Sequence, residues 1–323
     1  LPNFVMVGLP DTAVKESRDR VRSAIVNSRY KVPSGKITVN MAPADTRKEG
    51  AMYDLPVAVG ILASDEQIET VRSNEYAILG ELALDGKTRP VRGILPATME
   101  ARETGLTGIM LPVKNADEAA SVDGIDIIPV ASLDQAVGFL TGELDIRPYT
   151  QTPHKQSADA KHDIPDMSEV KGQQHVKRAM QIAASGSHNM LMVGPPGAGK
   201  SMLAKRMPGI LPELSREESL GTTRIHSVAG HLRRSAGLIT QRPFRSPHHT
   251  ISEAGMVGGG SNPRPGEVSL SHNGVLFLDE LPEFSKRTLE VLRQPIEDSR
   301  ITVARVSSVV EYPAKFMLIA AMN

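Results

Sequence analysis

Residues 190–201 read MLMVGPPGAGKS, an apolar run followed by a glycine-rich loop that ends in lysine and serine. Residues 194–201 fill the pattern GxxxxGK(S/T), and residues 202–207 continue with helical character. The four apolar residues before the loop are typical of a strand buried on both faces. The stretch therefore predicts a strand, a loop and a helix in succession, as at the start of an α/β domain with a parallel sheet.

The residue types of this loop suit phosphate binding. Glycines at 194, 197 and 199 allow the backbone to curl so that successive N–H groups point inward, and the following helix N-terminus adds partial positive charge. Lys200 would reach the β and γ phosphates of a nucleotide, and the Ser201 hydroxyl would bind Mg²⁺. We therefore expect ATP and Mg²⁺ as cofactors. The expected ATP-binding residues of the loop are Gly194, Pro195, Pro196, Gly197, Ala198, Gly199, Lys200 and Ser201.

A second apolar run, residues 275–278, ends in the acids Asp279 and Glu280. Asp279 would hold the metal ion together with Ser201, and Glu280 would orient and activate the attacking water. A third apolar run covers residues 316–321, and the spacing of the three runs suits a parallel sheet with helical crossovers. The alternative to a nucleotide site is a structural glycine loop and an unrelated surface pair of acids. It requires that both motifs follow apolar runs by coincidence.

With 323 residues, the chain is longer than a usual single domain, so we expect two. Residues 1–147 alternate short apolar runs with helical patterns, which favours an α+β or α/β fold. Residues 148–166 contain three prolines and little to bury, and predict a linker. Residues 167–323 would form the α/β ATPase core, which we expect to be cut short at its C-terminal end.

Composition restricts the class of protein. Apolar residues make up 40% of the chain, but no apolar run approaches the roughly 18 residues of a membrane span, so no membrane role is expected. The absence of cysteine excludes disulfides and thiolate metal sites here and fits a cytoplasmic location. The formal charge is zero, so any nucleic-acid binding must come from a local patch. Because the chain starts without methionine and stops directly after an apolar run, we expect it to be a fragment.

Longer strings carry a family resemblance. They are the opening LPNFVMVGLPDTAVKESRDRVRSAI, KEGAMYDLPVAVGIL at 48–62, GELALDGKTRPVRGILP at 80–96 and RPFRSPHHTIS at 242–252. With these strings the whole chain resembles the ComM/YifB family of magnesium-chelatase-like AAA+ ATPases. The resemblance implies a homohexameric ring that binds single-stranded or branched DNA and uses ATP to drive branch migration of DNA junctions in recombination and natural transformation.

The resemblance also implies roles for residues outside the two motifs. The stretch 170–173, including Val170 and Gly172, would border the adenine. Asn323 would be the sensor residue that helps to place the lytic water, and it joins Lys200 and Glu280 as a catalytic candidate. The family's arginine finger, second sensor arginine and cysteine-rich metal motif would follow Asn323.

The first domain resembles the Lon peptidase domain, an α+β fold of the S5-like type in which serine and lysine hydrolyse amides. Residues 51–53 here read Ala-Met-Tyr, and residues 93–97 contain no lysine. A thioether cannot attack a carbonyl, and no amine is available to activate a hydroxyl. We therefore expect no peptidase activity and assign the domain to ring assembly or to guiding DNA.

Basic residues gather between positions 224 and 264, where six arginines and four histidines accompany one carboxylate, Glu253. Such a segment could reach DNA phosphates as a pore loop. Alternatively, it contacts a neighbouring subunit or its ATP, or is a solvated loop. Residues 300–312 alternate in the manner of a hairpin, either an ordinary surface hairpin or a second DNA contact. The DNA-binding candidates are Arg242, Arg245, His248 and Arg305.

His248 and His249 are neighbours and would point to opposite faces if they lay on a strand, which disfavours a shared zinc ion. Two other functions remain open beside the DNA motor. One is a magnesium-chelatase-type motor subunit that acts on a protein partner. The other is an adaptor or scaffold whose ATPase only switches assembly.

Overall fold

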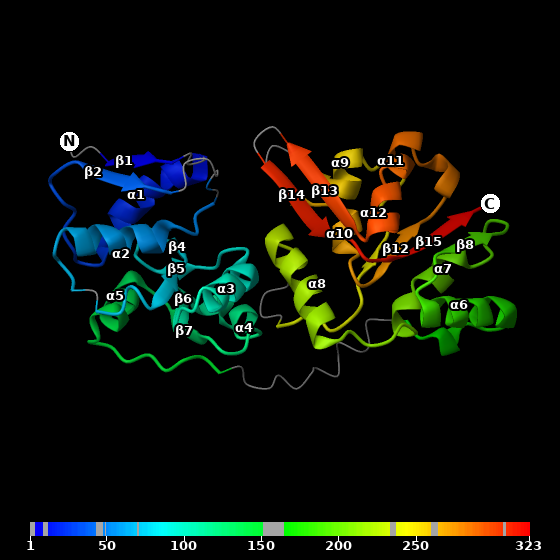
Figure 1. Ribbon diagram of the computed structural model, residues 1–323, viewed down its shortest axis with the longest axis horizontal. Helices are drawn as coiled ribbons and strands as arrows, with labels where there is room; N and C mark the ends of the chain where they lie inside the picture. Colours follow the sequence, from blue (N-terminus) through cyan, green and yellow to red (C-terminus); the bar gives the residue numbers. More distant parts are fainter. Residues whose placement is uncertain are drawn as a thin grey trace. The chain divides into compact units, whose positions relative to one another are not determined.

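The computed structural model describes residues 4–8, 12–42, 48, 50–69, 71–150, 165–232, 237–259, 264–305 and 308–323. The chain divides into two compact units, one made mainly of Leu1–Thr152 and the other mainly of Pro153–Leu232 and Leu238–Asn323 (Figure 1). The predicted linker, 148–166, falls largely outside the described residues.

The first unit mixes short strands with helices, as its alternating sequence pattern predicts. Its strands are β1 (Phe4–Val7), β2 (Ile37–Asn40), β3 (Tyr76–Ile78), β4 (Glu81–Leu82), β5 (Thr88–Arg89), β6 (Gly108–Pro112) and β7 (Asp126–Val130). Its helices are α1 (Thr12–Asn27), α2 (Asp54–Ser64), α3 (Ile94–Glu103), η1 (Val113–Asn115), α4 (Ala116–Ala119) and α5 (Leu133–Thr141). Strands β3, β6 and β7 form a parallel sheet in that order, β1 pairs with β2 in parallel, and β4 pairs with β5 antiparallel.

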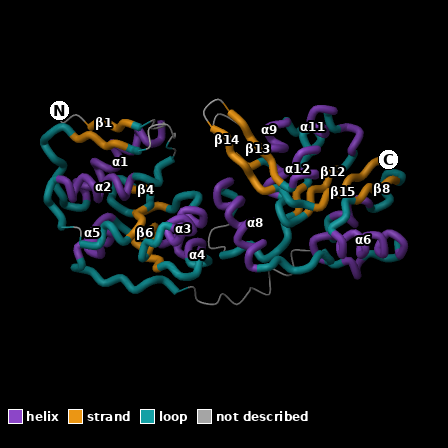
Figure 2. The backbone as a smooth tube through the Cα atoms, in the orientation of Figure 1, coloured by secondary structure: helices purple, strands orange, loops and turns teal. Residues whose placement is uncertain are grey.

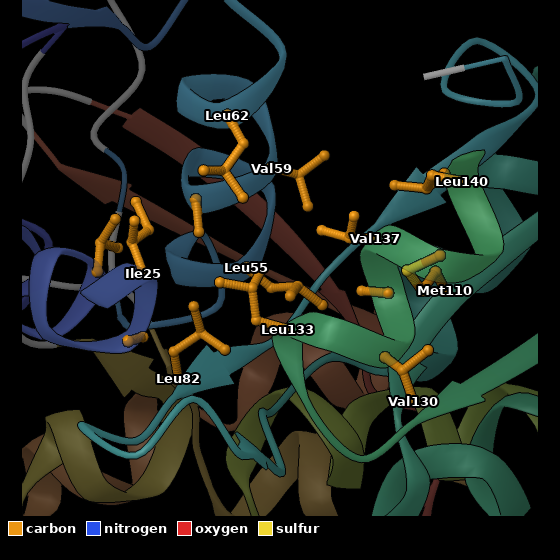
Figure 3. Close-up of a cluster of buried hydrophobic side chains, with 14 of the residues drawn as sticks. Ile25, Leu55, Val59, Leu62, Leu82, Met110, Val130, Leu133, Val137 and Leu140 are labelled. Atoms are coloured by element: carbon orange, nitrogen blue, oxygen red, sulfur yellow. The ribbon is translucent and has the colours of Figure 1, made fainter. Parts of the chain in front are cut away.

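Both faces of the β3–β6–β7 sheet are buried. Met110 and Val130 enter one core together with α1, α2 and α5 (Figure 3), and Ile128 belongs to the same core. Ile109 and Ile127 enter a second core with α3 and α4. The side chains alternate because successive strand residues point to opposite faces, so one strand serves two cores.

A buried ion pair connects α1, α2 and β4 in this unit. The Asp54 side chain is fully buried and accepts hydrogen bonds from Arg20 Nε at 2.8 Å and Nη2 at 3.3 Å. It also accepts the backbone N–H of Leu82 at 3.2 Å. The carboxylate raises the pKa of Arg20, chiefly through this hydrogen bond. Such a pair stabilises the fold only while both partners are present.

The second unit alternates strands and helices along the chain (Figure 2). Its strands are β8 (Met190–Val193), β9 (Phe244–Arg245), β10 (Gly258–Gly259), β11 (Arg264–Pro265), β12 (Val275–Leu278), β13 (Arg300–Arg305), β14 (Ser308–Pro313) and β15 (Met317–Met322). Its longer helices are α6 (Gln174–Gly186) and α8 (Arg216–Ala229). Its short helices are η3 (Met167–Glu169), α7 (Lys200–Ala204), η4 (Met207–Gly209), α9 (Glu253–Val257), α10 (Glu267–Leu270), η5 (Leu281–Glu283), α11 (Lys286–Glu290) and α12 (Arg293–Asp298).

The three predicted apolar runs become neighbouring strands of one parallel sheet, in the order β8-β15-β12-β9. Phe277 and Ile319 pack on one face with α6 and α7, whereas Leu276 and Ala320 pack on the other with α9, α10 and the region of α12. The predicted α/β fold with helices on both faces is therefore confirmed. The predicted hairpin is also confirmed, because β13 pairs antiparallel with β14.

One expectation about this sheet is wrong. The run 190–193 was expected to be buried on both faces, but Leu191 is 53% exposed and Val193 is 67% exposed. The reason is position: β8 is the end strand of the sheet within the described residues, so only β15 covers one of its edges. Within the described residues, no strand pairs with its other edge.

Candidate active site

The loop 194–201 joins the end of β8 to the start of α7. Gly197 and Gly199 adopt φ values of +79° and +85°, the left-handed region in which a side chain is strained. The backbone N–H of Gly194 donates to the Met322 carbonyl at 3.2 Å, which ties the loop to the end of β15. Two of the three predicted glycines are thus required by the backbone conformation.

The Lys200 ammonium lies inside the curve of this loop. Its Nζ donates to the carbonyl oxygens of Gly194 at 2.6 Å and Pro195 at 3.0 Å, and to Asn323 Oδ1 at 2.9 Å. An ammonium has three N–H donors, and these contacts account for all of them. The lysine, the loop and the last residue of the chain therefore meet at one point, although Asn323 is 123 positions away in sequence.

The serine of the loop lies against the first acid after β12. Ser201 Oγ donates to Asp279 Oδ2 at 2.5 Å, and the other Asp279 oxygen accepts the backbone N–H of Glu280 at 3.0 Å. A hydroxyl and a carboxylate oxygen side by side form the hard-oxygen donor set that Mg²⁺ prefers.

Glu280 leaves β12 in an unusual conformation. Its φ is +54°, and its carbonyl accepts the N–H of Glu283 at 2.8 Å in the turn of η5. The carboxylate is 59% exposed, and Oε2 lies 3.7 Å from His249 Nδ1. Sequence reasoning selected Glu280 but not His249, because their proximity depends on how β9 and β12 pair.

His248 and His249 do not lie on a strand. They follow β9 in a turn, with ring centroids 4.0 Å apart, so the opposite-face argument does not apply to them. Within the residues that the structure describes, no group of three or more histidine or acidic side chains is arranged to hold a metal ion.

A pocket of ≈ 350 Å³ adjoins the loop. Lys200, Gly194 and Pro195 line it, together with residues of α6 and β8 and Gln173. Of the stretch expected to border adenine, Gln173 is in the lining, whereas Val170 is buried and its carbonyl accepts a hydrogen bond from Lys177. Gly172 lies next to Gln173 with φ +69°. His175 and Val176 also line the pocket and were missed, because an amphipathic helix pattern does not separate core from pocket residues.

Two DNA-binding candidates are engaged within the second unit. Arg242 donates to the carbonyls of Pro212 at 2.5 Å and Asn273 at 2.7 Å and pairs with Glu218 at 3.1 Å. Arg245 forms a bidentate pair with Glu267, with both distances 2.6 Å. These contacts favour a structural role for both guanidinium groups, one that sequence reasoning did not weigh.

The remaining candidates are His248 and Arg305. His248 is exposed, and its Nδ1 lies 2.9 Å from Thr250 Oγ1. Arg305 ends β13, and its side chain lies outside what the structure describes. Arg224 and Arg264 are exposed and belong to the same basic segment. DNA contact by any of these residues remains a prediction.

Two partly buried histidines of this unit, His226 and His272, have lowered pKa values. Burial lowers the pKa of His272 to about 4, and the nearby Lys315 charge acts in the same direction. His272 Nδ1 accepts the backbone N–H of Lys315 at 3.0 Å, which requires an unprotonated nitrogen. Burial also lowers the pKa of His226, although its Nε2 lies 3.0 Å from the Leu270 carbonyl, which acts in the opposite direction. Both rings are therefore neutral parts of the fold near pH 7.

In the first unit, the positions compared with a peptidase site are helix beginnings. Residues 51–53 form the turn before α2, where the Met52 carbonyl accepts the Gly80 N–H at 2.8 Å. Gly93 precedes α3 with φ +74°.

Across the described residues, no helix has the length and apolar character needed to cross a membrane.

Comparison with known families gives two matches. A family model described as magnesium chelatase, subunit ChlI, matches residues 166–323, and one described as subunit ChlI of Mg-chelatase matches residues 1–115.

Relatives match over the whole chain. It is 48% identical over 323 residues to YifB of Escherichia coli, covering 100% of this chain and 63% of that protein. It is 44% identical over 325 residues to the competence protein ComM of Haemophilus influenzae, again covering 100% of this chain and 63% of that protein. The chain therefore spans 63% of the length of these relatives.

Two matches are partial. Lon protease 2 of Bacillus subtilis is 25% identical over 124 residues, which are 38% of this chain and 22% of that protein. A solved structure that models the complex between subunits BchI and BchD of magnesium chelatase aligns with a TM-score of 0.39 and 22% identity. It covers 48% of this chain and 53% of that one.

Proposed function

The chain belongs to the ComM/YifB family of magnesium-chelatase-like AAA+ ATPases, and from that membership we propose that residues 194–201 bind ATP, which Glu280 helps to hydrolyse. The observation that carries the proposal is the joint placement of three groups. Lys200 Nζ lies among the loop carbonyls and Asn323, while the neighbouring Ser201 Oγ contacts Asp279. A positive charge beside a hydroxyl–carboxylate pair is what Mg-ATP requires.

Mg²⁺ fits the oxygen atoms present. Ser201 and Asp279 would hold it, and the ion would neutralise charge on the phosphates during transfer. Asp279 is then engaged with the ion, which leaves Glu280 to orient and deprotonate water. Lys200 would exchange carbonyl contacts for phosphate oxygens, and Asn323 lies within reach of the same region.

We further propose that the full-length protein is a homohexameric DNA motor that moves branched DNA. The name of one relative, the competence protein ComM, supports a role in natural transformation, and the exposed Arg224 and Arg264 of the basic segment offer phosphate contacts. The second candidate function is a chelatase-type motor that acts on a protein partner, supported by the description of the family model over residues 166–323.

Hydrolysis and motor activity need separate tests on the full-length protein. ATP turnover with Mg²⁺ should be lost in Glu280→Gln with ATP still bound, whereas Lys200→Ala should lose binding as well. A labelled four-way DNA junction then tests the motor: ATP-dependent strand exchange by wild type and not by Glu280→Gln supports it. Turnover without strand exchange would reject the DNA motor and favour the chelatase-type alternative.

A further inference from the structure

Glu280 alone is poorly placed to act as a base. Its side chain has three rotatable bonds and is 59% exposed, so without a neighbour it would sample many orientations. A general base needs one orientation, within hydrogen-bond reach of the water that it activates. A contact that restricts the carboxylate would therefore raise the rate without changing how tightly ATP binds.

His249 lies in the position to make that contact. Its Nδ1 is 3.7 Å from Glu280 Oε2, slightly beyond hydrogen-bond distance, and a small rotation of either side chain closes the gap. The imidazole is the more enclosed partner, with 30% of its side chain exposed against 59% for the glutamate. The better-fixed group can thus hold the more mobile one.

Aromatic packing fixes the imidazole. The ring meets Phe284 edge to face, with centroids 6.4 Å apart and an interplanar angle of 80°. Phe284 is buried and ends the same η5 turn that begins after Glu280. His249 therefore lies against both ends of this turn. Its Nδ1 faces the Glu280 carboxylate, and its ring packs against Phe284.

The backbone around His249 is fixed as well. Its neighbour His248 stacks on it at 4.0 Å, and the His248 carbonyl accepts the Ile251 N–H at 3.0 Å. Ser252 then caps α9 by accepting the Gly255 N–H at 3.1 Å. The turn after β9 is thus a folded support for His249.

We propose that His249 is a positioning residue for the Glu280 carboxylate, holding it ready for water activation. The inference rests on the proposed ATPase function of this site.

The test compares variants of the full-length protein in two assays, with folding checked by circular dichroism. One assay is kcat for ATP hydrolysis at saturating Mg-ATP, and the other is Kd for the fluorescent analogue mant-ATP. His249→Ala should lower kcat roughly 10-fold, as expected for a misoriented group, and leave Kd within about twofold. His249→Asn, which places a polar group near the position of Nδ1, should recover most of the rate. His249→Phe keeps ring packing on Phe284 but should stay slow.

The variant His188→Ala, which removes an exposed histidine, serves as the matched control and should retain the wild-type kcat. Unchanged or faster turnover in both His249→Ala and His249→Phe would overturn the inference while leaving the ATPase proposal intact. Equal recovery by Phe and Asn would also overturn it, because packing alone would then explain the effect. No hydrolysis by the wild type would reject the ATPase proposal, and this inference with it.

Discussion

Stability of the second unit should depend on pH through His272. Its pKa is about 4 in the fold against 6.5 for the free side chain, so the unfolded chain binds the proton more readily between those values. The contribution of His272 to the free energy of unfolding is therefore fully present above about pH 6.5 and is lost as the pH falls toward 4. The pKa difference corresponds to at most about 3 kcal/mol, of which about 2 kcal/mol should be lost between pH 7 and pH 5.

The measurement is urea unfolding followed by far-UV circular dichroism at pH 5 and pH 7 for wild type and His272→Asn. Asparagine keeps an acceptor for the Lys315 N–H but cannot be protonated in this range. The contribution of the carboxylates to acid sensitivity is common to both proteins and cancels in the comparison. The variant should lose about 2 kcal/mol less than wild type over this interval. His188→Asn, which replaces an exposed histidine of the same unit, should behave as wild type. Equal losses in wild type and His272→Asn would refute the reasoning.

In the first unit, Asp54→Ala should lower the free energy of unfolding in urea by about 3 kcal/mol, because Arg20 loses its buried partner. The control Asp19→Ala, at an exposed pair, should lower it by less than about 0.5 kcal/mol. Similar losses in the two variants would contradict the ion-pair argument. Gly199→Ala should cost about 1–2 kcal/mol and weaken mant-ATP binding, because its φ is +85° and the added Cβ would lie 3.3 Å from Met202 Cε. Gly35→Ala, with open space around the new Cβ, is the control and should change neither. Arg242→Met should lower the free energy of unfolding by about 2 kcal/mol, and with it the melting temperature. Arg224→Met should leave the melting temperature unchanged but weaken DNA binding. Weaker DNA binding by Arg242→Met with an unchanged melting temperature would instead make Arg242 a surface ligand contact.

Local pattern predicts much of this fold. The apolar runs before Gly194 and Asp279 become β8 and β12 with unchanged bounds, because short apolar segments flanked by glycine and acids allow few alternatives. The hairpin β13–β14 follows from alternation. Helix α8 was not predicted, although Ser215 and Glu218 form the capping box that marks its start.

Long-range contacts are less accessible from sequence. The bidentate pair of Arg245 with Glu267 depends on where β9 and α10 pack, and a count of arginines cannot distinguish a paired guanidinium from a free one. In the same way, apolar composition does not tell whether β8 is a central or an end strand. The contact between His249 and Glu280 joins segments 31 residues apart and is invisible to any local motif.

The outer edge of β8 bears on how this polypeptide can be handled. Leu191 and Val193 are exposed, and no described strand pairs with the outer edge of β8, so a second molecule can add a strand there. We expect concentrated samples of these 323 residues to precipitate or to elute as mixed oligomers.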